Sequence, residues 1–214
     1  MKVLIIAAHP DDEVLGMGGT IKKLSKKKNE IQLCVVTEGA TGQYSDKKMI
    51  NVRRESCLKS SKILGISKVH FLDFPDMKLD SVPNLEINKK LEEIIKKFNP
   101  EIIYTTPKHD LNRDHKLVHE STLVVTRPTS SKVKQVYSYE LPGFVNEPFA
   151  PNVYVNIVSE FEYKIKAFNC YKTEIEKFPH PRSIESLENL AAYRGIESGT
   201  RKSEAFRLIK LIQD

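Results

Sequence analysis

The sequence predicts a Rossmann-like, doubly wound α/β fold whose mainly parallel sheet carries helices on both faces. Short runs of β-branched and other apolar residues alternate along the chain with longer segments of helical periodicity. Such alternation is typical of parallel strands joined by right-handed helical crossovers. Two of the apolar runs also end abruptly in histidine and aspartate clusters. Open α/β sheets bind ligands at the carboxyl ends of their strands, so these clusters mark the expected site.

The first strand is expected over residues 3–8, where a run of apolar residues has the length of a strand buried on both faces. Pro10 then ends ladder pairing and fixes a turn, which leaves His9, Asp11, Asp12 and Glu13 at the carboxyl end of the strand. A histidine and an aspartate three residues apart supply one nitrogen and one oxygen ligand, a pair suited to Zn²⁺ or a similar divalent metal. The alternative is a solvated turn in which an aspartate caps the next helix.

The remaining elements follow from the same two periodicities. Further strands are expected where short runs are apolar or alternate, over residues 31–37, 69–74, 102–105 and 133–141. Helices are expected where apolar residues recur every three or four positions, over residues 13–28, 48–64, 85–98 and 160–171, from His115 onward, and after a cap at Ser183. For the first helix Asp11 or Asp12 is expected as the N-cap, and for the helix at His115 the expected cap is Asp114.

Glycines inside the first helix invite comparison with a nucleotide-binding loop. The segment Gly16-Met17-Gly18-Gly19 begins seven residues after His9 and lies within a helical pattern, whereas a nucleotide loop occupies the strand-to-helix turn. We therefore reject a nucleotide site and expect close backbone approach to a neighbouring element.

The fourth strand runs into a second polar cluster, residues 107–119, that contains several candidate metal ligands. His115 and His119 are four residues apart and share one face of the expected helix, and His109 stands six residues before His115. Spacing alone does not choose between these three histidines.

Composition and charge exclude some classes of partner. The chain has 214 residues, which suits one domain over residues 1–214, and its net charge is +6. The lysine runs are interpreted as solvated helix faces, and no aromatic residues are interleaved with basic ones, so we expect no nucleic-acid partner. The first apolar run is too short to span a membrane and leads into acids instead of a cleavage site, so we expect no membrane anchor and no signal peptide.

Three cysteines indicate the compartment. Cys34, Cys57 and Cys170 are odd in number and form no Cys-x-x-Cys pair, so they are interpreted as reduced thiols of a cytoplasmic protein. The sequence leaves homo-oligomer formation open.

The segment Ala8-His9-Pro10-Asp11-Asp12-Glu13 resembles, without substitution, the signature of the LmbE/PIG-L family of zinc-dependent N-acetylglucosaminyl deacetylases. Asp114-His115 matches the Asp-His of the second motif of that family. The resemblance therefore implies Zn²⁺ held by His9, Asp12 and His115. It reaches the carboxyl-terminal segment, through Arg194-Gly195, Gly199 and Glu204-Ala205-Phe206.

The resemblance also implies roles around the metal. Arg53 and Asp76 fall where the family has substrate-contacting residues. Many relatives carry a catalytic histidine three residues before the ligand at 115, whereas this chain has Asn112, which we assign to substrate binding. His109 on the same loop is the candidate to replace that histidine as the acid.

These residues together predict a hydrolase. Three ligands leave a coordination position for water, as catalytic zinc sites do, and Asp11 beside them is placed to take the proton of that water. No Gly-x-Ser-x-Gly elbow is present, so water is the expected nucleophile. Asp11 or His109 would protonate the departing amine. We expect removal of acetyl from an N-acetyl sugar conjugate, with N-acetylglucosamine implied by resemblance alone. The alternatives are hydrolysis of another small amide, and a non-catalytic binding module with a structural metal.

Overall fold

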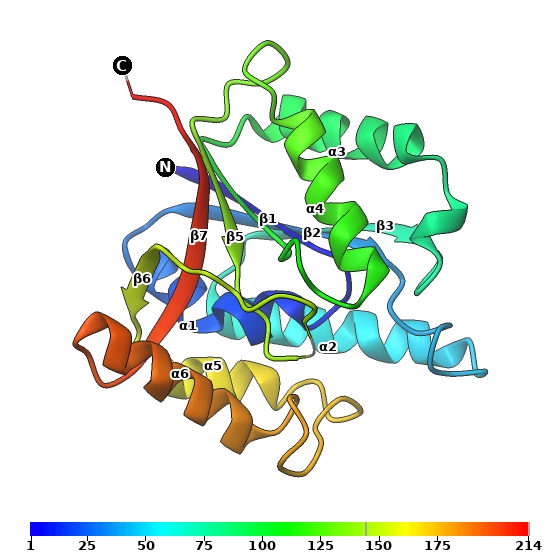
Figure 1. Ribbon diagram of the computed structural model, residues 1–214. Coiled ribbons are helices and arrows are strands. Elements are labelled where there is room, and N and C mark those ends of the chain that lie inside the picture. Colours follow the sequence, from blue (N-terminus) through cyan, green and yellow to red (C-terminus); the bar gives the residue numbers. More distant parts are fainter. Residues whose placement is uncertain (144, 214) are drawn as a thin grey trace.

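The computed structural model describes residues 1–143 and 145–213, and its centre is a seven-stranded sheet (Figure 1). The strand order is β3-β2-β1-β4-β5-β7-β6. The strands are β1 (Lys2–Ala7), β2 (Glu30–Thr37), β3 (Lys68–Phe74), β4 (Ile102–Thr105), β5 (Gln135–Tyr139), β6 (Val153–Asn156) and β7 (Ser203–Leu211). The first five strands run parallel, and β7 pairs antiparallel with β5 on one side and β6 on the other.

Helices cover both faces of this sheet, as expected for a doubly wound fold (Figure 1). The helices are α1 (Asp12–Lys26), α2 (Lys48–Leu64), α3 (Asn84–Phe98), α4 (Arg113–Val125), α5 (Phe161–Phe168) and α6 (Ile184–Ser198), with a short 3₁₀ turn η1 (Leu79–Ser81). One face carries α1, α2 and α5, which contact one another, and the other carries α3 and α4.

Strand β1 is central and supplies both halves of the core. Val3, Ile5 and Ala7 point into the apolar cluster under α1 and α2, while Leu4 and Ile6 point into the cluster under α3 and α4. All of these side chains are fully buried, which accounts for the continuous apolar run in the sequence. The polar residues that follow β1 are therefore anchored by a rigid strand.

Most of the expected elements are confirmed, but their ends and the carboxyl-terminal half differ. The prediction that Asp114 caps a helix from His115 is wrong, because α4 begins at Arg113 and its N-cap is Asn112, whose side chain accepts a hydrogen bond from the Asp114 N–H. The prediction missed β6 and β7. Strand β7 alternates only weakly, since Glu204, Arg207 and Lys210 interrupt its apolar residues.

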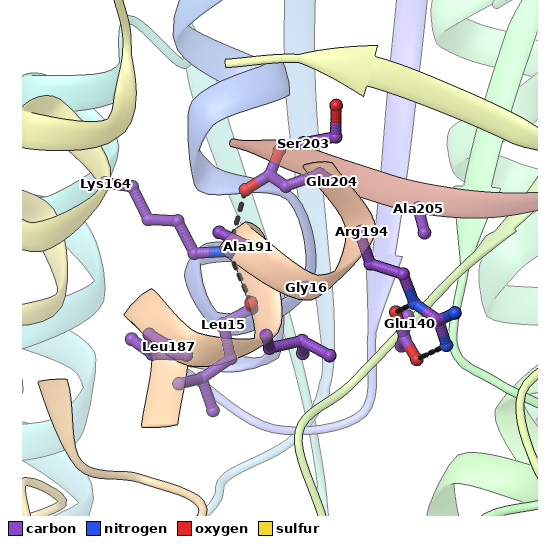
Figure 2. A pocket seen from close by; sticks show the side chains of 11 residues that line it. Leu15, Gly16, Glu140, Lys164, Leu187, Ala191, Arg194, Ser203, Glu204 and Ala205 are labelled. Atoms are coloured by element: carbon purple, nitrogen blue, oxygen red, sulfur yellow. Dashed lines mark hydrogen bonds and ion pairs between the residues drawn. The ribbon is translucent and has the colours of Figure 1, made fainter. Parts of the chain in front are cut away.

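Helix α1 is broken at Met17, whose φ of −147° and ψ of 25° are not helical. The break leaves backbone groups without helical partners, and a buried ion pair satisfies them (Figure 2). Lys164 Nζ donates to the Leu15 carbonyl at 2.8 Å and to Glu204 Oε1 at 2.7 Å. Glu204 in turn accepts from the N–H groups of Gly19 and Thr20, at 3.0 and 2.7 Å. Lys164 and Glu204 thus stabilise both sides of the break.

The glycines of α1 allow the close packing expected from the sequence. A Cβ atom on Gly16 would overlap the ring of Tyr139, whose hydroxyl donates to the Ile6 carbonyl at 3.1 Å. A Cβ atom on Gly19 would lie 2.8 Å from the side chain of Ile157. Packing therefore explains these glycines.

Two smaller expectations concern cysteines and membranes. Cys34, Cys57 and Cys170 are all free thiols, and the first two are buried. Among the helices of residues 1–143 and 145–213, none has both the length and the apolar character to cross a membrane.

Candidate metal centre

Histidines and aspartates from three loops meet at the carboxyl ends of β1, β3 and β4. His9 and Asp12 follow β1, Asp76 follows β3, and His115 lies in the first turn of α4 after β4. Strands β1 and β4 are parallel neighbours with Val3 opposite Ile102, so the loops that follow them begin side by side. The topology therefore joins two clusters that are about a hundred residues apart in the sequence.

Donor atoms of His9, Asp12 and His115 lie near the separations that a tetrahedral metal requires, with a different Asp12 oxygen facing each histidine. His9 Nδ1 is 3.1 Å from His115 Nε2. The Asp12 carboxylate places Oδ2 3.5 Å from His9 Nδ1 and Oδ1 3.4 Å from His115 Nε2. A tetrahedral zinc with ligand bonds of about 2.0–2.1 Å separates its donor atoms by about 3.3 Å. All three side chains are buried, and the donor set fits a divalent metal.

Carboxylates hold the other nitrogen of each histidine. Asp110 Oδ2 lies 2.7 Å from His115 Nδ1, and Asp114 Oδ2 lies 3.2 Å from His9 Nε2. Such partners fix the tautomer and orientation of a metal-binding imidazole. Asp110 stands in the polar cluster noted in the sequence, but only its contact with His115 identifies its role.

Asp114 also ties the loop after β3 to the site. Its carboxylate accepts hydrogen bonds from the backbone N–H groups of Met77 and Leu79, at 2.8 and 3.1 Å. His9 Nε2, Asp76 and Asp114 form a second group that could hold a metal, with Asp76 Oδ1 3.3 Å from His9 Nε2. Because both Asp114 oxygens already accept backbone hydrogen bonds, we interpret this second group as support for the first.

The histidines and carboxylates of this cluster shift the pKa values of one another. Burial opposes the charging of His9, but the carboxylates of Asp114 and Asp12 outweigh it and raise the His9 pKa to about 10. Burial likewise opposes the charging of His115, yet Asp12 and Asp110 raise its pKa to about 9. Burial would raise the pKa of the Asp12 carboxyl, but His115 and His9 hold it well below its ordinary value. The negative charge of these carboxylates is therefore balanced by positive charge, either protons on the histidines or a bound metal.

Asp11 lies beside this group with an unusual environment. It is fully buried, and neither carboxylate oxygen has a hydrogen-bond partner among the described residues. Its backbone φ is 127°, which is rare for a residue other than glycine and is typical of functional turns. Two arginines flank it, with Arg53 NH2 3.5 Å from Oδ1 and Arg182 Nε 3.7 Å from Oδ2.

A buried glutamate holds both of these arginines. Glu174 forms ion pairs with Arg53 and with Arg182, the latter at 2.8 Å, and it accepts a hydrogen bond from the Tyr44 hydroxyl at 3.1 Å. Sequence reasoning missed Glu174 and Arg182. They belong to the segment between α5 and α6, which has no local signature, and only the fold brings that segment to Asp11.

Four of the residues singled out in the sequence share one pocket with Arg182. This pocket is lined by His9, Gly39, Gln43, Arg53, Asp76, Met77, Asn112 and Arg182. In it Asp76 accepts a hydrogen bond from the Gly42 N–H at 3.0 Å. The neighbouring Arg54 is outside the pocket and pairs with Asp73 at the surface.

The other two histidines of the second cluster lie away from His9, Asp12 and His115. His109 is partly exposed, and its Nδ1 is 3.4 Å from Glu147. His119 is buried and its Nδ1 donates to the Thr106 carbonyl at 2.8 Å. Both line a separate pocket between α4 and β7.

Known proteins resemble this chain over nearly its whole length. A diacetylchitobiose deacetylase of Thermococcus kodakarensis is 28% identical over 97% of this chain and 83% of that protein. The uncharacterized deacetylase YaiS of Escherichia coli is 32% identical over 80% of this chain and 90% of that protein. The solved structure of N,N'-diacetylchitobiose deacetylase from Pyrococcus horikoshii in complex with an inhibitor superposes with a TM-score of 0.80, at 26% identity, over 98% of this chain and 84% of that one.

The family model described as PIG-L, GlcNAc-PI de-N-acetylase, matches residues 4–126. That span contains the three donor residues, the carboxylates behind them and Asp11, whereas Glu174 and Arg182 lie beyond it. This chain belongs to the LmbE/PIG-L family of de-N-acetylases.

Proposed function

We propose that this protein is a zinc-dependent amidohydrolase that removes the acetyl group from an N-acetylated sugar, with an N-acetylglucosamine conjugate as its substrate. The observation that carries the proposal is a buried His-Asp-His donor set beside Asp11, a buried carboxylate that has no hydrogen-bond partner among the described residues. A structural zinc site is closed by four protein ligands, whereas a catalytic site uses three and keeps one position open.

His9 through Nδ1, His115 through Nε2 and the Asp12 carboxylate would hold the metal. Zinc bound there would supply a Lewis acid that activates water near neutral pH and polarises the amide carbonyl. Asp110 and Asp114 would keep the two imidazole rings in the orientation that ligation needs, through the distances of 2.7 and 3.2 Å given above.

We assign the role of general base to Asp11. Asp11 is next in sequence to Asp12, but its carboxylate has no hydrogen-bond partner among the described residues, so it is available to accept the proton of the attacking water. Arg53 and Arg182 place positive charge on either side of it, which holds the carboxylate in position. Asn can take its place without a large change of shape, so the role can be tested directly.

The departing nitrogen needs a proton. We assign its return to Asp11, because a group that takes the proton of the water can deliver it to the amine in the next step. His109 stays the second candidate, although its ring faces Glu147 in the neighbouring pocket. Asp76 and Asn112 line the pocket of the metal centre and are our candidates for contacts with the sugar.

Acetate release by purified, zinc-loaded protein tests the proposal. We expect hydrolysis of N-acetylglucosamine or diacetylchitobiose, loss of activity after chelation and recovery on addition of Zn²⁺. Elemental analysis should give about one zinc per chain. If the zinc-loaded protein releases no acetate from a broad panel of N-acetyl sugars, the deacetylase proposal is wrong and a binding role gains support.

A further inference from the structure

We propose that Arg182 binds the substrate, by donating a hydrogen bond to a hydroxyl oxygen of the sugar. This inference deepens the proposed deacetylase function and rests on it. Arg182 belongs to the segment between α5 and α6, yet it lines the same pocket as His9, Asp76 and Asn112.

Arg53, which the sequence assigned to substrate binding, lines the same pocket but is almost completely enclosed by protein. Its side chain is only 2% exposed, and its NH2 group donates to the Pro10 carbonyl at 2.6 Å. The Nε and NH1 atoms are buried and have no hydrogen-bond partner among the described residues, and NH1 forms an ion pair with Glu174. Arg53 therefore acts on Asp11 and Glu174 from within the protein.

Arg182 differs in the two properties that substrate binding requires. Its side chain is 27% exposed, against 2% for Arg53. Its NH1 atom is held by Glu174 at 2.8 Å and its Nε lies 3.7 Å from Asp11. The NH2 atom contacts no acceptor among residues 1–143 and 145–213, and it is free to donate.

The backbone around Arg182 is fixed, so the guanidinium is positioned before substrate arrives. The Arg182 N–H donates to His180 Nδ1 at 3.1 Å, and the Arg182 carbonyl accepts from the Glu176 N–H at 3.2 Å. Glu174 is itself buried and is held by Tyr44. A donor held in this way loses little conformational entropy on binding.

The charges near the pocket favour a neutral oxygen as the acceptor. Asp11, Asp12 and Asp76 are all buried around it, so an anionic group on the substrate would meet three carboxylates as well as the arginine. A sugar hydroxyl accepts from Arg182 without that repulsion. The scissile acyl oxygen is the competing acceptor, and kinetics separate the two.

The first experiment compares Arg182→Ala with the parent and with Lys177→Ala, an exposed residue of the same segment. Loss of a hydrogen bond from a charged donor should raise KM about 10- to 100-fold. Because Arg182 also flanks Asp11, kcat should fall as well, and by the same factor for every substrate. Zinc content should stay at the parent value, and Lys177→Ala should match the parent. Arg182→Lys should recover only part of the loss, because Lys lacks the fork that bonds Glu174 and substrate together.

The second experiment removes the acceptor instead of the donor. The 3-, 4- and 6-deoxy analogues of N-acetylglucosamine are assayed with the parent and with Arg182→Ala. With the parent, one analogue should have a lower kcat/KM than the full sugar, by the same factor that Arg182→Ala raises KM for the full sugar. For that analogue, Arg182→Ala should cause little further loss apart from the fall in kcat that all substrates share. A role confined to holding Glu174 and Arg53 would lower all analogues equally, which would overturn the inference.

The outcomes separate this inference from the function on which it rests. A fall in kcat with unchanged KM would limit Arg182 to a role at Asp11 or at the acyl oxygen and would overturn the hydroxyl assignment. An active parent with an unaltered Arg182→Ala variant refutes the inference alone. A zinc-loaded parent that cleaves no N-acetyl sugar refutes the proposed function and this inference with it.

Discussion

Asp110 Oδ2 lies 2.7 Å from Nδ1 of His115, five residues later, and so leaves the Nε2 atom of that ring directed at His9 and Asp12. The carboxylate also helps to raise the His115 pKa to about 9 against the effect of burial, which makes the ring a stronger base and a stronger metal ligand. Asp110 thus prepares a ligand that it does not join.

Replacing Asp110 by Asn tests this relationship. Asn keeps the size of the side chain and one acceptor oxygen but removes the negative charge, so zinc affinity should fall about 10- to 100-fold. Competition with a fluorescent chelator measures the affinity. Asp80→Asn, an exposed aspartate near α4, is the matched control and should bind zinc as the parent does. Equal affinities in all three proteins would show that Asp110 has no influence on the metal.

Asp11 and Asp12 are adjacent carboxylates with different proposed roles, and two substitutions separate them. Asp11→Asn removes the base but none of the three donors, so zinc content should be unchanged while kcat falls by a factor on the order of 10² to 10⁴. Asp12→Asn removes a proposed anionic ligand, so its main effect should be a lower zinc affinity. Metal analysis and acetate release on the same samples give both readouts. An Asp11→Asn variant that turns over like the parent would reassign the base.

His115 and His119 have different partners in the structure, and the sequence alone does not predict this difference. Both histidines lie on one face of α4, and spacing alone does not distinguish them. The resemblance selected His115, and the structure places it against His9 and Asp12, while the Nδ1 of His119 is turned to the Thr106 carbonyl. That contact belongs to the loop after β4, and no periodicity in the sequence specifies it.

His119 should then affect the pH dependence of stability without affecting zinc. Burial lowers its pKa below the ordinary value, so the folded protein keeps it neutral while the unfolded chain takes up a proton below about pH 6.5. The stability contribution is therefore complete above pH 6.5 and is lost as the pH falls further. The parent should lose more thermal stability than His119→Asn between pH 7.5 and pH 5.5.

Zinc content provides the control for this comparison. His119→Asn should keep its metal, whereas His115→Ala should release it, because only His115 contributes a donor to the three-residue set. The metal centre is common to the parent and His119→Asn, so its own pH dependence cancels in the difference between them. Parallel stability curves for these two proteins would contradict a buried, neutral His119.

Sequence reasoning succeeded where the determinants are local. The strand ahead of His9 follows from its apolar run, and the alternation of elements predicts the parallel half of the sheet. It failed where the partner is distant: Glu174 and Arg182 meet Asp11 only through packing of the segment after α5. The same holds for the cap of α4, since Asp114 is occupied by His9, Met77 and Leu79 and leaves the capping position to Asn112.

The break in α1 offers a last test, on stability. Lys164 and Glu204 are each 4% exposed and compensate one another inside the protein, beside the helix that begins at Asp12, a proposed metal ligand. Lys164→Met keeps the apolar stem but leaves the Glu204 charge unpaired and the Leu15 carbonyl without its donor. Breaking a buried ion pair in this way should cost about 3–5 kcal/mol in the free energy of unfolding, measured with urea.

Adding Glu204→Gln to Lys164→Met should restore part of that loss, on the order of 1 kcal/mol or more, because it removes the uncompensated charge. The Gln oxygen still accepts from the Gly19 or Thr20 N–H group, so the second half of α1 stays capped. Lys166→Met, on the exposed side of the same helix α5, should change stability by less than about 0.5 kcal/mol. A double variant less stable than Lys164→Met alone would mean that the Glu204 charge stabilises the helix break even without its lysine, and that the two residues do not act as a compensated pair.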